Sequence, residues 1–191
     1  DLRIISWEAA DVLLCYSKVL KDSGFKKNIL SNKDIDNPVT IADLKVNETV
    51  IKGIKDKYRD VNWEILSEEN VKTNSNNFNR KADWIWILDP LDGTKDFIQG
   101  TGNYAMHLAL NFKNKPFIGI VLIPEKDELW IAFEGQVLYE KRNGTKKFLI
   151  RKSSSIISEI TLVTSKNHVN PTLTKLIEMM NFKKVIEMGS V

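Results

Sequence analysis

Two early segments of the chain carry apolar residues at helical spacing. The segment from residue 7 to residue 20 predicts a helix with one face made of Ala10, Leu13, Leu14, Ser17 and Leu20, because residues three or four positions apart share a helix face. Gly24 is a suitable helix stop. Residues 41–58 predict a second helix, whose apolar side we assign to Ile41, Leu44, Val50, Ile51 and Ile54.

Shorter apolar runs, separated by turn residues, predict strands through the middle of the chain. They cover residues 62–66, 83–88, 104–112, 117–124, 128–133, 136–140 and 147–150. Turns at 113–115 and 142–144 suggest that the later strands form an antiparallel meander. The polar stretches 26–36 and 70–79 are expected to be connections, the first with room for a short strand.

The last forty residues predict one strand–helix–strand unit. Residues 159–164 and 182–188 predict strands, and Asn170 and Pro171 are suited to cap and begin a helix that runs to Met180. The serines at 153–155 form the best candidate linker. We therefore predict an α/β layered fold, with a first domain at 1–152 and the start of a second, incomplete domain at 153–191.

Composition and charge change this picture little. The 191 residues are 42% hydrophobic and 28% charged, with a net charge of +3, as in an ordinary globular protein. No basic stripe interleaved with aromatics suggests a nucleic-acid polymer as partner. No apolar run reaches the ~18 residues of a membrane span, and no signal-peptide pattern is evident. We expect Cys15, the single cysteine, to be a buried structural thiol in a cytoplasmic protein.

The segment with most chemical content is the hexapeptide from Asp89 to Thr94, Asp-Pro-Leu-Asp-Gly-Thr, which follows a strongly apolar run. Mg²⁺ binds through one or two carboxylates together with substrate phosphate oxygens, and Asp89 and Asp92 are suited to that role. Gly93 permits close backbone approach to a ligand. Since Asp, Pro and Gly are also the usual turn residues, this segment alone is more often a simple turn than a metal site.

Two further segments carry acidic residues near predicted element ends. Glu68 and Glu69 follow the strand predicted at 62–66, where successive side chains alternate in direction, so one could bind a metal while the other holds a water. Thr40 and Asp43 have the spacing of a helix capping box, with Asp in place of the usual Glu or Gln. Taken separately, an acidic turn and a helix cap explain both segments.

Together and in this order, the three segments resemble the inositol monophosphatase superfamily. The family pattern runs Pro-Val-Thr-x-Ala-Asp, then Glu-Glu at a strand end, then Asp-Pro-Leu/Ile-Asp-Gly-Thr, and all three are present. The segment from Gly93 to Phe97, Gly-Thr-Lys-Asp-Phe, resembles the CysQ-type branch of 3'(2'),5'-bisphosphate nucleotidases. The resemblance extends from about Asp11 to Val191 and implies an α-β-α-β-α sandwich.

The resemblance also implies roles for individual residues. Metal ligands would be Glu68, Asp89, the Leu91 carbonyl and Asp92. Two ions about 4 Å apart would clamp the attacking water and the leaving oxygen.

Asp43 and Thr94 would orient the attacking water, and Glu69 would hold a water of a further ion. The substrate would contact Gly93, Thr94, Lys166 and His168, whereas His107 is expected to be structural.

The activity implied is Mg²⁺-dependent release of the 3'-phosphate of adenosine 3',5'-bisphosphate to give AMP. Two or three Mg²⁺ ions, inhibition by Li⁺, a small phosphorylated nucleotide as partner and either a monomer or a homodimer are expected with it. An inositol or other sugar-phosphate phosphatase, and a non-catalytic metal- or nucleotide-binding protein, remain alternatives. The family's later Trp-Asp element, which supplies another metal-binding Asp, is absent before Val191, so we expect this sequence to be a fragment.

Overall fold

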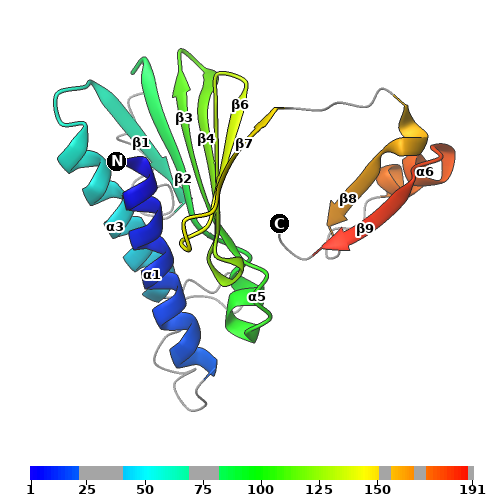
Figure 1. Ribbon diagram of the computed structural model, residues 1–191, viewed down its shortest axis with the longest axis horizontal. Coiled ribbons are helices and arrows are strands. Elements are labelled where there is room, and N and C mark those ends of the chain that lie inside the picture. The colour runs from blue at the N-terminus through cyan, green and yellow to red at the C-terminus, as the bar shows by residue number, and fades with distance from the viewer. Residues whose placement is uncertain (22–40, 69–81, 151–155, 166–170, 189–191) are drawn as a thin grey trace.

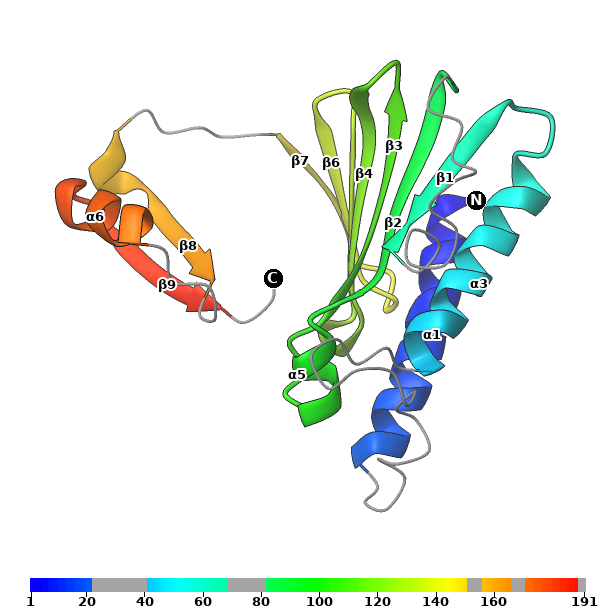
Figure 2. The same cartoon turned by 180° about the vertical axis from the view of Figure 1, so that it is seen from behind.

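The computed structural model describes residues 1–21, 41–68, 82–150, 156–165 and 171–188. Two helices, α1 (Leu2–Lys21) and α3 (Ile41–Lys57), precede seven strands that form one sheet. The predicted linker at 153–155 and the predicted connections at 26–36 and 70–79 lie outside the described residues. In Figure 1, α1 and α3 run side by side over one face of the sheet, and Figure 2 shows the same arrangement from behind.

The large sheet follows the order of its strands in the sequence. Its strands are β1 (Trp63–Ser67), β2 (Trp84–Asp92), β3 (Ala105–Phe112), β4 (Lys115–Ile123), β5 (Glu128–Phe133), β6 (Gln136–Glu140) and β7 (Lys146–Ile150). Strand β1 pairs with β2 in parallel, and every later pair is antiparallel. The predicted strands and the predicted meander are confirmed. The bounds differ at β2, which continues past Leu88 to Asp92, and at β4, which begins two residues before the predicted start, at Lys115.

Three short elements complete the described chain before the last unit. Helix α5 (Thr94–Gln99) follows β2, the 3₁₀ helix η1 (Pro124–Lys126) joins β4 to β5, and a second 3₁₀ turn, η2, covers Ile157–Glu159. Beyond them, β8 (Thr161–Ser165) and β9 (Lys184–Met188) pair in parallel around α6 (Pro171–Met179) as a separate two-stranded sheet. The predicted strand–helix–strand unit is therefore present, and the domain boundary at 152 stays a prediction.

The core lies between the two long helices and the sheet. Helix α1 buries the face predicted from its period, including Ala10, Leu13, Ser17 and Leu20. Sheet residues such as Leu88, Leu108, Leu122 and Leu129 pack against them. This burial of apolar surface is the main stabilising contribution to such a layer.

One sequence prediction about the helices was wrong, and a second, the apolar side of α3, was right for Val50 and Ile54 but wrong for Ile41 and Leu44. Cys15 is exposed, because two residues beyond the buried Leu13 correspond to about 200° of helical rotation, which places it on the opposite face. In α3, Ile41 and Leu44 are 40% and 41% exposed, whereas the buried face holds Ala42, Asp43, Val46, Asn47, Val50 and Ile54. The difference at α3 matters for function, since the face of α3 that is buried includes Asp43.

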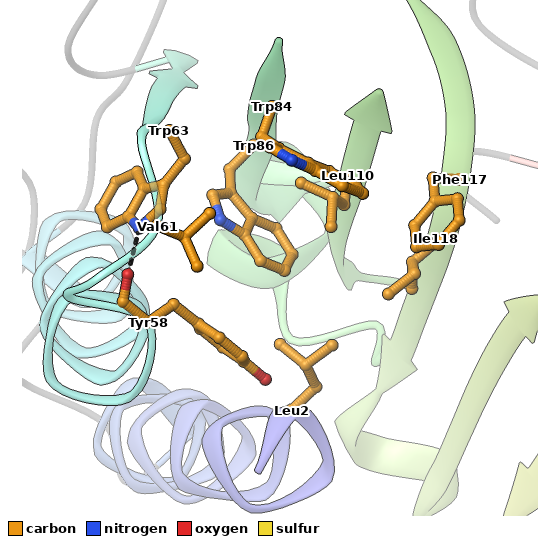
Figure 3. A pocket seen from close by; sticks show the side chains of 9 residues that line it. All are labelled: Leu2, Tyr58, Val61, Trp63, Trp84, Trp86, Leu110, Phe117 and Ile118. Atoms are coloured by element: carbon orange, nitrogen blue, oxygen red, sulfur yellow. Dashed lines mark hydrogen bonds between the residues drawn. The ribbon is translucent and has the colours of Figure 1, made fainter. Parts of the chain in front are cut away.

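At one end of the sheet, aromatic side chains surround an apolar pocket of about 190 Å³ (Figure 3). Trp84 and Trp86 from β2, together with Tyr58 and Trp63, form much of its wall. The Trp63 indole Nε1 donates a hydrogen bond to the Tyr58 carbonyl at 2.8 Å. Because Trp84 begins β2 and Asp92 ends it, this pocket lies at the opposite end of the strand from the acidic residues.

Candidate active site

The pairing of β1 with β2 brings two acidic segments together. Their parallel register aligns Ser67 with Leu88, so both strands reach the same edge of the sheet, where Glu68 and Asp89 follow. Carboxyl ends of neighbouring parallel strands are a common place for ligand sites. Residues separated by about twenty positions in the sequence thus become neighbours, as the candidate metal site requires.

A β-bulge lies within the acidic loop itself. Asp89 pairs with His107, and Asp92 pairs with Ala105. The chain therefore advances three residues along β2 over the stretch in which it advances two residues along β3. In a regular strand, residues three apart point to opposite faces. The extra residue of the bulge cancels that alternation, and therefore Asp89 and Asp92 are directed to the same side of the sheet. Pro90, which lacks an N–H for the ladder, suits this position.

Local hydrogen bonds stabilise the bulge and the turn that follows. The Leu91 backbone N–H donates to Asp89 Oδ1 at 3.2 Å, and Thr94 Oγ1 donates to the Leu91 carbonyl at 3.1 Å. Gly93, the N-cap of α5, has φ +84°, a left-handed conformation that favours glycine. The side chain of Leu91 is buried, so the loop is anchored in the core while its carboxylates remain at the edge.

The electrostatics of Asp89 indicate a concentration of negative charge. Burial raises the pKa of Asp89, and the carboxylates of Glu68 and Asp92 raise it further; the nearby His107 and the Leu91 N–H act in the opposite direction. His107 lies across from Asp89 on β3. The structural role expected for His107 stays a prediction, and its proximity to Asp89 follows only from the register of β2 with β3.

Asp43 approaches the same edge from the helix layer. It is 3% exposed and lies one turn before Asn47 on the buried face of α3. Asn47 Oδ1 accepts a hydrogen bond from Ser67 Oγ at 2.5 Å, which ties this face of α3 to the end of β1 just before Glu68. The structure therefore brings Glu68, Asp89, Leu91, Asp92, Gly93 and Thr94 to the carboxyl ends of β1 and β2, and it places Asp43 on the buried face of α3, one turn from the Asn47–Ser67 hydrogen bond. Glu69, Lys166, His168 and the predicted cap Thr40 lie outside the described residues.

The donors at this edge fit Mg²⁺ in chemistry, since Glu68, Asp89, Asp92 and the Leu91 carbonyl all offer the oxygen ligands that a hard cation binds. The described part of the chain does not, however, group three His, Cys, Asp or Glu side chains closely enough to enclose one ion. The residues thus fit Mg²⁺ in the type of ligand atom that they offer, and the assignment of each ligand stays a prediction.

A family of known proteins matches nearly the whole chain. The Inositol monophosphatase family profile matches residues 4–191. The chain belongs to the inositol monophosphatase family. The family predicted from the sequence is confirmed.

Curated relatives within the family include CysQ-type enzymes. The chain is 28% identical over 169 residues to the 3'(2'),5'-bisphosphate nucleotidase CysQ of Salmonella typhimurium, covering 87% of this chain and 65% of the relative. It is 30% identical over 164 residues to the CysQ of Buchnera aphidicola, covering 84% and 58%. The chain thus spans about two thirds or less of the length of these relatives, and the predicted resemblance to the CysQ branch is confirmed.

Solved structures of the family share the fold. CysQ from Bacteroides thetaiotaomicron matches with a TM-score of 0.64 at 24% identity, covering 93% of this chain and 68% of that one. The extragenic suppressor protein suhB from Bartonella henselae matches with a TM-score of 0.65 at 19% identity, covering 99% and 69%. The predicted α/β class of the inositol monophosphatase type is confirmed. Separately, none of the helices in the described residues is long and apolar enough to cross a membrane.

Proposed function

We propose that the protein containing this chain is a Mg²⁺-dependent phosphomonoesterase that releases the 3'-phosphate of adenosine 3',5'-bisphosphate, giving AMP and phosphate. The observation that carries the proposal is the parallel register of β1 and β2 together with the bulge in β2, which collects Glu68, Asp89 and Asp92 at one sheet edge. The nucleotide preference rests on the CysQ-type relatives and on the run Lys95-Asp96-Phe97.

The residues have distinct roles in this proposal. Glu68, Asp89, the Leu91 carbonyl and Asp92 would hold Mg²⁺, which when bound lowers the pKa of a coordinated water and stabilises charge on phosphoryl oxygens. Thr94 and Asp43 orient the attacking water. The Thr94 hydroxyl already donates to the Leu91 carbonyl, so its second role is to accept a hydrogen bond from that water. A carboxylate such as Asp43 can hold the water's other proton.

The remaining parts of the site are also proposals. The backbone N–H groups of Gly93 and Thr94 would contact the phosphate, Glu69 would hold a water of a further ion, and Lys166 and His168 would touch the nucleotide. We expect two or three ions, inhibition by Li⁺ and a cytoplasmic location.

The test is Mg²⁺-dependent phosphate release by the full gene product, offered adenosine 3',5'-bisphosphate and inositol 1-phosphate side by side. A higher kcat/KM for the nucleotide supports the proposal. A higher kcat/KM for inositol 1-phosphate would support the proposed metal site but would show that the substrate is an inositol phosphate rather than the nucleotide. Absence of release with both, combined with calorimetric binding of Mg²⁺ or nucleotide, would favour the non-catalytic alternative.

A pair of substitutions, one at the end of β2 and one just before its start, tests the site itself. Asp92→Asn keeps the size of the side chain but removes a charge, and we expect kcat/KM to fall by about 10²-fold or more, since even residues that only support metal ligands contribute about 10–100-fold. Asp83→Asn is the matched control, because Asp83 is an exposed carboxylate beside the other end of the same strand. Near-wild-type turnover by Asp92→Asn would refute the assignment.

A further inference from the structure

A hydrogen-bond cluster is centred on Glu125 and has no part in the roles described above. Glu125 Oε1, from η1, accepts hydrogen bonds from Ser17 Oγ at 2.6 Å, Lys21 Nζ at 2.8 Å and Tyr104 Oη at 3.1 Å. Ser17 and Tyr104 are each 2% exposed. One carboxylate oxygen therefore joins the last turns of α1, the turn between β4 and β5, and the residue that precedes β3.

Tyr104 connects this cluster to α5. Its ring packs edge-on against the ring of Phe97, with centroids 4.7 Å apart and planes at 87°, a favourable aromatic geometry. Phe97 is fully buried and is the buried side chain of α5. The contacts thus run from Glu125 through Tyr104 to Phe97, which belongs to the helix that begins at Thr94.

Helix α5 depends on such tertiary contacts for its position. It has six residues and is flanked by Gly93 and Gly100, with φ of +84° and +72°. So short a helix is unstable by itself, and glycines at both ends leave its direction free to vary. The segment after α5 also packs on the cluster, since a Cβ built on Gly102 would lie 3.5 Å from Glu125 Cγ.

We propose that Glu125 and Tyr104 are positioning residues that fix α5 and thereby hold Thr94 in register with the acidic loop. The link to chemistry is the 3.1 Å hydrogen bond from Thr94 Oγ1 to the Leu91 carbonyl, which a tilt of α5 would lengthen. This inference rests on the proposed function for its catalytic consequence, whereas the fixing of α5 can be measured without turnover.

The test compares Glu125→Ala with Glu140→Ala in the full gene product. Glu140 is a matched control because it too accepts hydrogen bonds from α1 side chains, Arg3 and Trp7, but lies at the end of β6. For Glu125→Ala we expect kcat to fall about tenfold with KM within about twofold, as for a small displacement of a reacting group. Protection of the α5 amides from hydrogen exchange should fall about tenfold as well.

Glu140→Ala should lower stability while leaving kcat and α5 protection unchanged. Glu125→Gln, which keeps an acceptor oxygen, should restore kcat to within about threefold of wild type, because the Tyr104 hydroxyl again has a partner. If Glu125→Ala does not fold, Tyr104→Phe decides, since it removes the hydroxyl and keeps the ring against Phe97; its kcat and α5 protection should change in the same direction.

Equal kcat and equal α5 protection in the Glu125→Ala and Glu140→Ala variants would overturn the proposal. Loss of α5 protection with an unchanged kcat would overturn the catalytic consequence alone. If wild-type protein releases no phosphate from either ester, the proposed function fails, and α5 protection still shows whether the cluster fixes the helix.

Discussion

The ion pair between Arg3 and Glu140 offers a test of how the first helix is attached to the far part of the sheet. Glu140, at the end of β6, is 4% exposed. Both of its oxygens accept hydrogen bonds from Arg3, and Oε1 also accepts from Trp7 Nε1 at 3.3 Å. Glu140→Gln keeps the shape of the side chain but places an amide N–H₂ against one of the Arg3 donors.

The magnitude follows from the exposure of the two partners. Breaking a fully buried ion pair costs about 3–5 kcal/mol. Here the Arg3 side chain is 40% exposed, so its guanidinium can be rehydrated when the carboxylate is removed. The loss should then approach that of one charge-assisted hydrogen bond, about 1.5–3 kcal/mol in the free energy of unfolding.

The assay is urea unfolding of both proteins between pH 7 and pH 3. The Arg3 hydrogen bonds, helped by Trp7 and Lys146, hold the pKa of Glu140 below its usual range in spite of its burial. A lowered folded-state pKa stabilises the protein above the unfolded pKa of about 4.3 and loses that contribution as pH falls through the folded value. The difference between wild type and Glu140→Gln should therefore be full at pH 7 and shrink below about pH 4.3.

The control is Glu8→Gln, which makes the same charge change at an exposed position of α1. It should alter the free energy of unfolding by less than about 0.5 kcal/mol. If Glu140→Gln at pH 7 matches this control, or if its destabilisation does not diminish in acid, then the ion pair does not hold α1 to β6 as we argue.

Two further predictions concern the core and a hairpin. Leu129→Ala, at a fully buried position of β5, should lower the free energy of unfolding by about 2–5 kcal/mol, whereas Phe148→Ala, at 74% exposure, should change it by less than about 0.5 kcal/mol; similar effects of the two in thermal melts would contradict the packing described. Lys113 and Asn114 have φ of +49° and +63°, so the double substitution to Asn-Gly, the preferred pair for a type I′ turn, should raise stability by about 0.5–1 kcal/mol, and a loss of stability in urea unfolding would refute the turn assignment.

Local sequence patterns predict structure correctly where that structure depends on neighbouring residues. Apolar periodicity located α1, α3 and the seven strands of the large sheet, because helix and strand periods of 3.6 and 2 residues appear directly in the order of side chains. The acidic hexapeptide indicates a chemically unusual segment because its carboxylates, proline and glycine follow one another. At α3 the same periodicity was right for Val50 and Ile54, which are buried, and wrong for Ile41 and Leu44, which the tertiary packing leaves exposed.

The sequence by itself therefore determined the elements, the family pattern and the acidic loop, whereas the tertiary structure decided how these meet. A one-residue change of register moves every side chain of a strand to the other face. The spacing of residues along the chain predicts neither the alignment of Ser67 with Leu88 nor the bulge after Asp89. The Glu125 cluster and the Arg3–Glu140 pair likewise join residues more than a hundred positions apart in the chain. Such contacts depend on long-range strand pairing and layer packing, which no local pattern of apolar and polar residues encodes.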